Sequence, residues 1–372
     1  MKKINIILDH NYYYNTSISR VAAMYGNQLS KNGYEVTISY PVLSWYRYYL
    51  LFLWQKHALL KYLLFNAKFL LRDLYKLVLM KERGYALSKD VRLNRYWYKP
   101  TKQNIPDADY IIIFQGQLLF DLVALPKNKG IIIDSLHTGN YSGDTGMGKW
   151  FNYLLETVYL RVNVKRFAVS STVSDFYKKS GVRVDKVINN GVDIDEFKPS
   201  SLSDKKVGYL MFSDAKKAKG YDFGVGVIKH LKAQGVKEKF YSIGRHIKGL
   251  DTSIFDEVYG ALNGARYAEA LRKHLFFLYP SLYDGFPAPP LEAMASGAVC
   301  IIANVAGVNE YAVDGENCML CEPGNLNDFV IKINRLLSNT KLRENISKNA
   351  VLTARRYSWE ICAKNIMELM NT

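Results

Sequence analysis

The chain has 372 residues, of which 49% are hydrophobic and 23% charged, so it can fill two globular cores of ordinary size. Its net charge of +16 calls for an acidic partner or surface, such as nucleic acid, anionic lipid or a phosphate-bearing substrate. Four cysteines are too few for a disulfide scaffold and fit a reducing compartment, and the apolar run at the start is too short for a signal peptide.

The first forty residues predict a strand, a helix and a second strand at 4–9, 16–31 and 35–40. This alternation is typical of a doubly wound α/β sheet. The loop after the first strand reads D-H-N-Y-Y-Y-N-T-S and lacks the glycines of a dinucleotide fingerprint, which disfavours NAD. Asp9 and His10 are placed where open parallel sheets bind ligands, although the same residues also suit a solvated loop.

Residues 41–102 interrupt the alternation with a long helical stretch followed by a basic segment. They contain 13 Lys and Arg against three acids, so +10 of the net charge is local to them. The longest uncharged run, 48–55, is far shorter than a membrane span. Basic and aromatic residues together favour a helix that lies in a membrane interface. A helical hairpin packed on its own domain is the alternative, and nucleic-acid binding is disfavoured because no recognised module accompanies the charge.

Strands predicted at 109–116 and 130–137 resume the alternation. His137 then falls just past the carboxyl end of a central strand, where ligand chemistry in such sheets occurs. The glycine-rich loop at 138–148 follows it. A further helix is predicted with Ser174 as its cap, and the polar segment after residue 186 indicates a domain boundary.

A second αβ unit begins with a strand predicted at 207–212 and a helix at 222–234. The loop between them holds Lys216, Lys217 and Lys219 beside a glycine. Lysines at a strand-to-helix turn suit a diphosphate.

The stretch 276–324 carries the densest motif. An apolar strand ends at Pro280, and a loop with Asp284, Gly285 and Phe286 follows. A helix is expected to begin near Pro290 or Leu291, which places Glu292 in its first turn. Backbone N–H groups at such a site attract phosphate, whereas the two carboxylates suit hydroxyls. The combination favours a sugar nucleotide as ligand.

One pair of cysteines and one pair of aspartates could be taken for metal ligands, but neither pair fits a metal site. Cys318 and Cys321 form a lone C-x-x-C without a second pair, which favours two buried positions at a strand end. Asp193 and Asp195 lie in a turn between domains without further ligands. We therefore expect no metal.

These motifs together resemble the GT-B glycosyltransferases of the large retaining family 4. The resemblance rests on H-T after a strand, N-G-V-D-I-D-E-F-K-P at the boundary, K-G at the second strand-to-helix turn, and P-S-L-Y-D-G-F-P-A-P-P-L-E-A-M-A-S-G followed by G-V-N-E-Y. It implies two Rossmann-like doubly wound domains that face each other across a cleft. The expected domains are 1–198, with the insertion 41–102, then 199–355, and a C-terminal helix 356–372 that crosses back to the first domain.

The resemblance also implies roles for individual residues. The family's Glu-x7-Glu pair corresponds to Asp284, which would lie near the transferred sugar, and Glu292, which would bind the ribose hydroxyls. Lys219, helped by Lys216 or Lys217, would face the diphosphate, and His137 would orient the reacting sugar. Gly285, Phe286 and the helix N-terminus near Leu291 would complete the donor site, without a required metal.

Three departures from the family pattern stand out. Asp284 replaces a glutamate, and Asp214 occupies the position five residues before Lys219 where the family usually has an arginine. Asp9-His10-Asn11 stands where the family usually has a glycine pair after the first strand.

The implied activity is transfer of a hexosyl or deoxyhexosyl group, with no cofactor, from a UDP-, GDP- or dTDP-linked sugar to a glycan or lipid-linked glycan. Together with the basic segment, this activity predicts a cytoplasmic enzyme of cell-surface polysaccharide synthesis (capsule, O-antigen or similar). The enzyme is expected to be a peripheral protein at the inner face of the plasma membrane and to bind no nucleic acid. A non-catalytic nucleotide- or glycan-binding scaffold with a degenerate site is the alternative.

Overall fold

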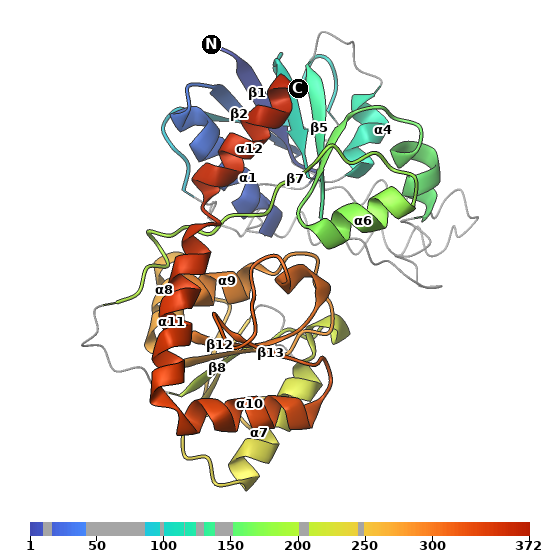
Figure 1. The fold of residues 1–372 in the computed structure, drawn as a ribbon. Helices are drawn as coiled ribbons and strands as arrows, with labels where there is room; N and C mark the ends of the chain where they lie inside the picture. The colour runs from blue at the N-terminus through green and yellow to red at the C-terminus, as the bar shows by residue number, and fades with distance from the viewer. Residues whose placement is uncertain are drawn as a thin grey trace. The chain divides into compact units, whose positions relative to one another are not determined.

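The computed structural model describes residues 1–9, 17–41, 86–96, 100–114, 116–123, 130–137, 152–200, 208–244 and 249–372. The chain forms two compact units, Met1–Ile188 with Ala363–Thr372 and Asn189–Cys362, which we call unit 1 and unit 2 (Figure 1). His10, the glycine-rich loop 138–148 and most of the expected insertion lie outside the described residues.

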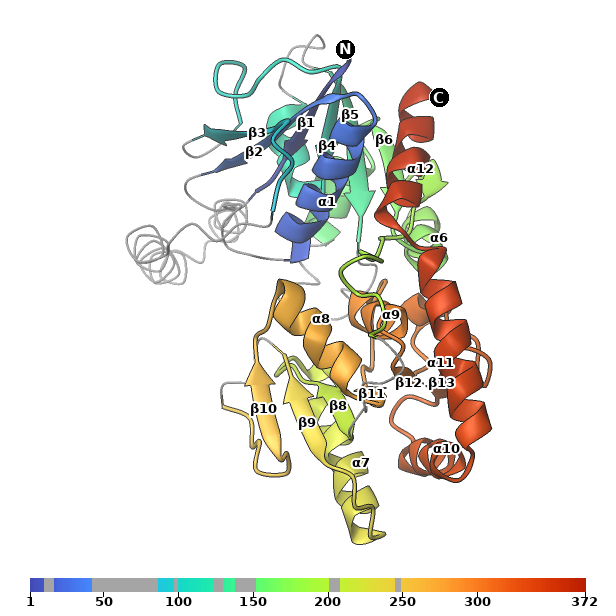
Figure 2. The ribbon, with the colours of Figure 1, turned by 90° about the vertical axis from the view of Figure 1, so that its left-hand side faces the viewer.

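Unit 1 is built on a seven-stranded sheet in the order β3-β2-β1-β4-β5-β6-β7, with every pairing parallel (Figure 2). Its strands are β1 Lys3–Ile7, β2 Glu35–Pro41, β3 Val91–Tyr96, β4 Tyr110–Ile113, β5 Ile131–Leu136, β6 Lys165–Ala168 and β7 Lys186–Val187. The central strands are buried on both faces, which accounts for their runs of isoleucine. The predicted doubly wound sheet is confirmed.

Strand β3 lies inside the range 41–102 that the sequence assigned to a helical insertion with a basic tail. It pairs with β2 at the edge of the sheet, and the Arg92 guanidinium lies 2.8 Å from the Glu35 carboxylate across the pair. Most of its residues are exposed or half-buried, so V-R-L-N-R-Y shows no buried apolar run. The range is therefore not helical throughout.

The helices of unit 1 connect these strands. They are α1 Ser17–Lys31, α4 Leu119–Leu122, α6 Ser171–Lys179, the short 3₁₀ helix η2 Gly116–Leu118 and the π-helix η4 Leu155–Tyr159. The cap predicted at Ser174 is wrong. Ser170 is extended and its Oγ accepts the N–H of Val173 at 3.2 Å, whereas Ser174 lies buried within the helix.

Unit 2 contains a six-stranded parallel sheet in the order β10-β9-β8-β11-β12-β13. Its strands are β8 Tyr209–Phe212, β9 Phe240–Ile243, β10 Glu257–Gly260, β11 Phe276–Tyr279, β12 Val299–Ala303 and β13 Met319–Cys321. Cys318 and Cys321 are buried, as predicted.

Helices cover both faces of this sheet: α8 and α9 lie on one face, and α7 and α10 on the other (Figures 1 and 2). The helices of unit 2 and the C-terminus are α7 Tyr221–Ala233, α8 Gly264–Lys273, α9 Ala288–Ala295, α10 Leu326–Ser338, α11 Thr340–Arg355 and α12 Trp359–Asn371, with 3₁₀ helices η5 Lys217–Lys219 and η6 Ala306–Val308. Asn325 caps α10 as predicted, because its side chain accepts the N–H of Asp328.

The unit boundaries fall at 188/189 and 362/363, whereas the sequence analysis placed the domain boundaries at 198/199 and 355/356. The segment after β7 belongs to unit 2 because the Val192 N–H donates to the Tyr357 carbonyl at 2.7 Å. Helix α12 spans the second boundary. Its end belongs to unit 1, where the Lys165 ammonium donates to the Leu369 carbonyl at 2.9 Å.

Within the described ranges, no helix combines the length and apolarity needed to cross a bilayer.

A buried ion pair joins the two strands beside the end of β5 that leads to His137. The Asp134 carboxylate on β5 and the Arg166 guanidinium on β6 are 0% and 2% exposed, and their closest atoms lie 3.6 Å apart. The guanidinium also donates to the Val162 carbonyl at 2.7 Å and lies over the ring of Tyr159. Burial raises the pKa of Asp134 to about 7, although the positive charge of Arg166 opposes this.

Arg166→Met leaves this carboxyl buried without its countercharge, and we expect unit 1 to lose about 3 kcal/mol of unfolding free energy at pH 8. At pH 5 the loss is smaller, since the buried carboxyl then takes up a proton and the unfolded carboxyl does not. Urea unfolding at both pH values measures the difference. The double variant Asp134→Leu/Arg166→Met should be more stable than Arg166→Met alone, and equal stability of the two would contradict this account.

Candidate active site

The order of strands in unit 2 places β8 and β11 side by side at the centre of the sheet. From β8 the chain winds outward to β9 and β10, and from β11 it winds the other way to β12 and β13. The loops that follow β8 and β11 therefore run in opposite directions from the topological switch point of the sheet. Ligands of open α/β sheets bind at this position.

The two loops are joined by hydrogen bonds to one carbonyl. The Ala218 oxygen, in the loop after β8, accepts the N–H of Leu282 at 2.8 Å and the Ser281 hydroxyl at 3.0 Å, both from the loop after β11. Gly220 has a φ of +65°, and a Cβ there would overlap the carbonyl oxygen of Pro280. A glycine is therefore required for this close approach.

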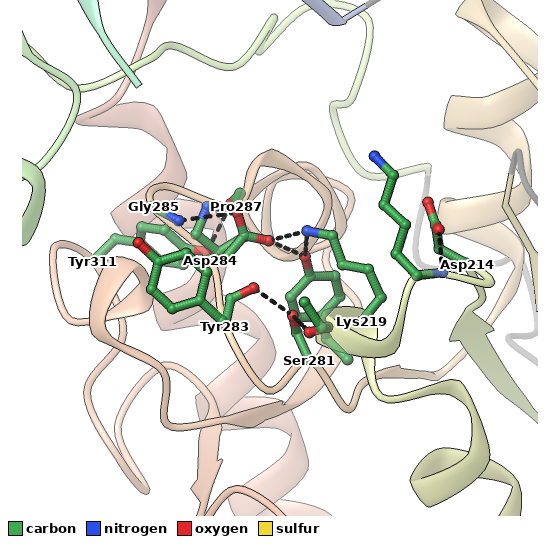
Figure 3. Close-up of polar contacts among 11 residues, drawn as sticks. Asp214, Lys219, Ser281, Tyr283, Asp284, Gly285, Pro287 and Tyr311 are labelled. Carbon is green, nitrogen blue, oxygen red and sulfur yellow. Dashed lines mark hydrogen bonds and ion pairs between the residues drawn. The ribbon is translucent and has the colours of Figure 1, made fainter. Parts of the chain in front are cut away.

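Three polar side chains meet between these loops (Figure 3). The Lys219 ammonium forms an ion pair with Asp284 Oδ2 and lies 3.4 Å from the Tyr279 hydroxyl. The Tyr279 hydroxyl donates to the same Asp284 oxygen at 2.6 Å. The structure thus brings together two of the residues that the sequence assigned to the donor site, Lys219 and Asp284.

The backbone around Asp284 is fixed from a third loop. Asp284 Oδ1 accepts the N–H of Gly285 at 3.1 Å, and the Asp284 carbonyl accepts the N–H of Gly307 at 3.2 Å. A Cβ on Gly307 would overlap the Gly285 carbonyl, so the loop after β12 can lie this close only with glycine. Gly307 is the glycine of the G-V-N-E-Y motif.

Asp214 turns its carboxylate toward its own loop. Its Oδ1 accepts the N–H of Lys216 at 2.9 Å, and the residue is 7% exposed. Lys216 and Lys217 are exposed on the turn that leads to Lys219. The turn therefore carries three positive charges at the switch point.

Helix α9 begins at Ala288, earlier than predicted, because its first turn accommodates Pro289 and Pro290. Pro287 occupies the N-cap position and makes no side-chain cap. Glu292 is therefore not in the first turn. It is 4% exposed in the second. Pro287, Pro289 and Pro290 have no N–H, so among the four residues at the start of the helix, 287–290, only Ala288 offers one.

The remaining donor-site candidate in this loop, Phe286, is 8% exposed. Its ring lies 5.6 Å from that of Tyr311 and 6.2 Å from that of Tyr357, measured between centroids. The Tyr311 hydroxyl in turn donates to the Pro287 carbonyl at 2.8 Å. This aromatic cluster fixes the start of α9.

His137 lies in unit 1, immediately after β5, whereas Lys219, Asp284 and Glu292 belong to unit 2. Its Nε2 is 3.0 Å from the Ser135 hydroxyl, and its ring lies 5.8 Å from that of Phe114. Burial lowers the pKa of His137 to about 4. The imidazole is therefore neutral at pH 7 and can both donate and accept a hydrogen bond.

The sheet of unit 1 has its own switch point between β1 and β4. Asp9, directly after β1 and 2% exposed, accepts a hydrogen bond from the side-chain amide of Gln117 in η2, after β4. Sequence reasoning placed Asp9 at this edge and missed Gln117, because a lone glutamine in a short turn carries no signal.

Among the described residues, no cluster of three or more His, Cys, Asp or Glu side chains could hold a metal ion.

Residues 193–352 match the family model of Glycosyl transferases group 1. This part of unit 2 is similar to the group 1 glycosyltransferases. It is 33% identical over 124 residues to an uncharacterized glycosyltransferase of Methanocaldococcus jannaschii, and the match covers 33% of each chain. It is also 33% identical over 108 residues to the N,N'-diacetylbacillosaminyl-diphospho-undecaprenol alpha-1,3-N-acetylgalactosaminyltransferase of Campylobacter jejuni, covering 28% of this chain and 29% of that one. These matches span a third or less of the relatives' length.

The chain also shares its fold with solved structures. The Anabaena HepE protein, determined in complex with UDP and glucose, has a TM-score of 0.68 at 15% identity, over the whole of both chains. The two parallel α/β sheets thus have the GT-B fold that the sequence predicted.

The low pKa of His137 makes the stability of this protein depend on pH. Between about pH 6.5 and about pH 4 an unfolded histidine binds a proton that the folded one does not, so unfolding becomes easier as the pH falls. From pH 7.5 to pH 5 we expect the wild type to lose up to about 2 kcal/mol more unfolding free energy than His137→Asn does. Urea unfolding of both proteins checks this, and an equal loss in the two would refute it.

Proposed function

We propose that this protein is a retaining glycosyltransferase that moves a hexosyl or deoxyhexosyl group from a nucleoside-diphosphate sugar to a hydroxyl of a lipid-linked glycan. The observation that carries the proposal is the Lys219 turn, which is held at the switch point of a group 1 glycosyltransferase domain. Its product would be a cell-surface polysaccharide such as a capsule or O-antigen.

The donor's diphosphate is the part that Lys219 would bind. An ammonium has three N–H groups. Asp284 takes one, and the Tyr279 hydroxyl accepts a second at 3.4 Å, so the third can turn to a phosphate oxygen. Lys216 and Lys217 add positive charge on the exposed side of the same turn. Negative charge develops on the departing diphosphate in the transition state, and these cations would stabilise it there.

The remaining donor contacts would come from the loop and helix after β11. Glu292 would accept hydrogen bonds from the ribose hydroxyls. Gly285, Phe286 and Leu291 would border the donor, with Phe286 acting through the aromatic cluster that fixes its loop. The neutral imidazole of His137 would orient the transferred sugar without adding positive charge.

The reaction would proceed on one face of the sugar. The bond between the anomeric carbon and the β-phosphate oxygen breaks, and the acceptor oxygen bonds to the same carbon from the same side. The acceptor's proton passes to the departing phosphate oxygen. The anomeric configuration is then retained, and no enzyme nucleophile is required.

The acceptor and the membrane are inferred from the basic aromatic range 41–102, most of which lies outside the described residues. A cationic aromatic segment binds anionic lipid headgroups and would bring the enzyme to a lipid-linked substrate at the inner face of the plasma membrane. The Campylobacter jejuni relative is named for a diphospho-undecaprenol acceptor, which supports this choice.

A degenerate, non-catalytic scaffold is the second candidate. It is favoured by Asp214, whose carboxylate replaces a positive charge in the donor turn, and by the shortened Asp284. A scaffold would bind a nucleotide or glycan without transferring a sugar.

The first test is a thermal-shift screen of UDP-, GDP- and dTDP-sugars, beginning with UDP-glucose because the Anabaena HepE structures contain UDP. One of them should raise the melting temperature, by an amount that corresponds to about 2.7 kcal/mol at 100 times its Kd. Glu292→Gln should weaken that donor's kcat/KM by about 10-fold or more, because it removes a charged hydrogen-bond acceptor.

Glu344→Gln, an exposed change on α11, is the matched control and should behave as the wild type. Binding without any transfer or hydrolysis would favour the scaffold. If no sugar nucleotide binds, the proposed function is wrong.

The second test addresses the membrane. Replacing Lys56, Lys61, Lys68 and Arg72 by glutamine should weaken co-sedimentation with phosphatidylglycerol-containing vesicles, since each basic residue near the surface contributes about 1 kcal/mol. The control carries the same charge change at four exposed lysines of unit 2: Lys237, Lys239, Lys341 and Lys348. Unchanged co-sedimentation of the first variant would rule out membrane binding by this segment.

A further inference from the structure

Tyr279 has a buried ring and a hydroxyl at the end of a central strand. It ends β11, between β8 and β12, and is 1% exposed. Its ring packs against Phe212 and Phe277, with centroids 5.5 and 6.4 Å away. The ring is therefore held by the core, and only the hydroxyl reaches the edge of the sheet where the donor turn lies.

The hydroxyl acts on Asp284. It donates to Oδ2 at 2.6 Å, and this is the same oxygen that pairs with the Lys219 ammonium. Two donors fill the two lone pairs of Oδ2, while Oδ1 accepts the N–H of Gly285 and retains one lone pair. The carboxylate is thus fixed at both oxygens, and its position determines where the ammonium lies.

The hydroxyl keeps its proton at neutral pH. Burial and the neighbouring Asp284 charge raise the pKa of Tyr279 well above its ordinary value. The phenol is therefore a hydrogen-bond donor to the carboxylate under the conditions in which a sugar nucleotide would bind.

A lysine side chain has four rotatable bonds, so an ammonium exposed to water does not stay in one position unless another group holds it. Lys219 is 22% exposed and its partner Asp284 is 17% exposed, so the rigid element of the trio is the buried ring of Tyr279. The order of support runs from the strand to the phenol, then to the carboxylate and then to the ammonium.

We propose that Tyr279 is a positioning residue of the donor site, which acts through Asp284 to hold the Lys219 ammonium where a diphosphate binds. Asp284 is then first the countercharge of Lys219, and its remaining Oδ1 lone pair is what it can offer to a sugar hydroxyl. This inference rests on the proposed function, because it assigns Lys219 to a diphosphate.

The test is Tyr279→Phe, which removes the hydroxyl and keeps the ring. Its matched control is Tyr209→Phe on the neighbouring strand β8, where the ring is stacked between Phe240 and Phe276. The Tyr209 hydroxyl is buried and has no hydrogen-bond partner within the described residues. Both variants lose one buried phenol oxygen from the same sheet, and only one loses a contact to the donor turn.

The readout is binding of UDP, GDP and dTDP by calorimetry, each compared with its nucleoside. For the diphosphate that binds the wild type, Tyr279→Phe should weaken affinity by about 10-fold, the size expected for one hydrogen bond to a charged group. Affinity for the corresponding nucleoside should change less than about twofold, because the nucleoside has no phosphate for Lys219. Tyr209→Phe should leave both affinities unchanged. A merely structural role for Tyr279 predicts that the nucleoside and the diphosphate weaken together.

A double-mutant cycle shows whether Tyr279 acts through Asp284. In an Asp284→Ala background, Tyr279→Phe should have an effect of less than about twofold on diphosphate affinity. An equal effect in both backgrounds would overturn the inference, and so would a Tyr279→Phe protein that binds like the wild type. If Tyr279→Phe lowers the melting temperature, its weaker binding could come from lost stability, and Asp284→Ala alone becomes the test. Asp284→Ala should then reduce the preference for diphosphate over nucleoside, and an unchanged preference would overturn the inference as well.

These outcomes separate the two proposals. A wild type that binds none of the three diphosphates refutes the proposed function, and the inference with it. A wild type that binds and transfers, with an unaffected Tyr279→Phe variant, refutes the inference alone.

Discussion

The ion pair between Lys219 and Asp284 joins two loops that are 65 residues apart in the sequence. It forms because β8 and β11 are parallel neighbours, so that their carboxyl ends deliver both loops to one edge of the sheet. The positive charge of the donor turn is tied to the sheet through this contact and the shared Ala218 carbonyl. Without parallel pairing at the switch point, the same residues would be unrelated surface charges.

Two different physical means keep charge in place in the two units. In unit 1, Asp134 and Arg166 are sealed inside the sheet, where their pairing has a desolvation cost. In unit 2, the Lys219 and Asp284 pair stays partly exposed, so its desolvation cost is modest and its charges remain available. The imidazole of His137 needs no countercharge, because burial lowers its pKa and keeps it neutral.

Much of this fold follows from the sequence because its central strands are continuous apolar runs, such as I-I-I at 111–113 and F-F-L-Y at 276–279. The edge strands β3 and β10 could not be predicted so easily. Their sequences, V-R-L-N-R-Y and E-V-Y-G, mix charged and apolar residues because much of each strand faces solvent. The start of α9 was misplaced because two prolines in succession left its first turn undefined.

The site was predictable as a set of residue types and not as a set of contacts. Lys219 and Asp284 stand out in motifs, but their pairing depends on strand order, which no local pattern encodes. Tyr279 was interpreted as one more apolar strand residue, since its ring is in the core and only the hydroxyl has a polar task. Gly307 was noted only as part of a motif, and Gln117 was missed, because the importance of both residues lies in what they touch.

The two prolines in the first turn of α9 have a wider consequence. They remove two of the backbone N–H groups that would otherwise give a helix N-terminus its fixed affinity for anions. The positive potential of this site therefore depends on side chains, chiefly those of the 216–219 turn. Side chains can be exchanged by single codon changes without disturbing the sheet, whereas backbone amides cannot. Such a site can change its preferred phosphate ligand during evolution while the fold around it stays the same.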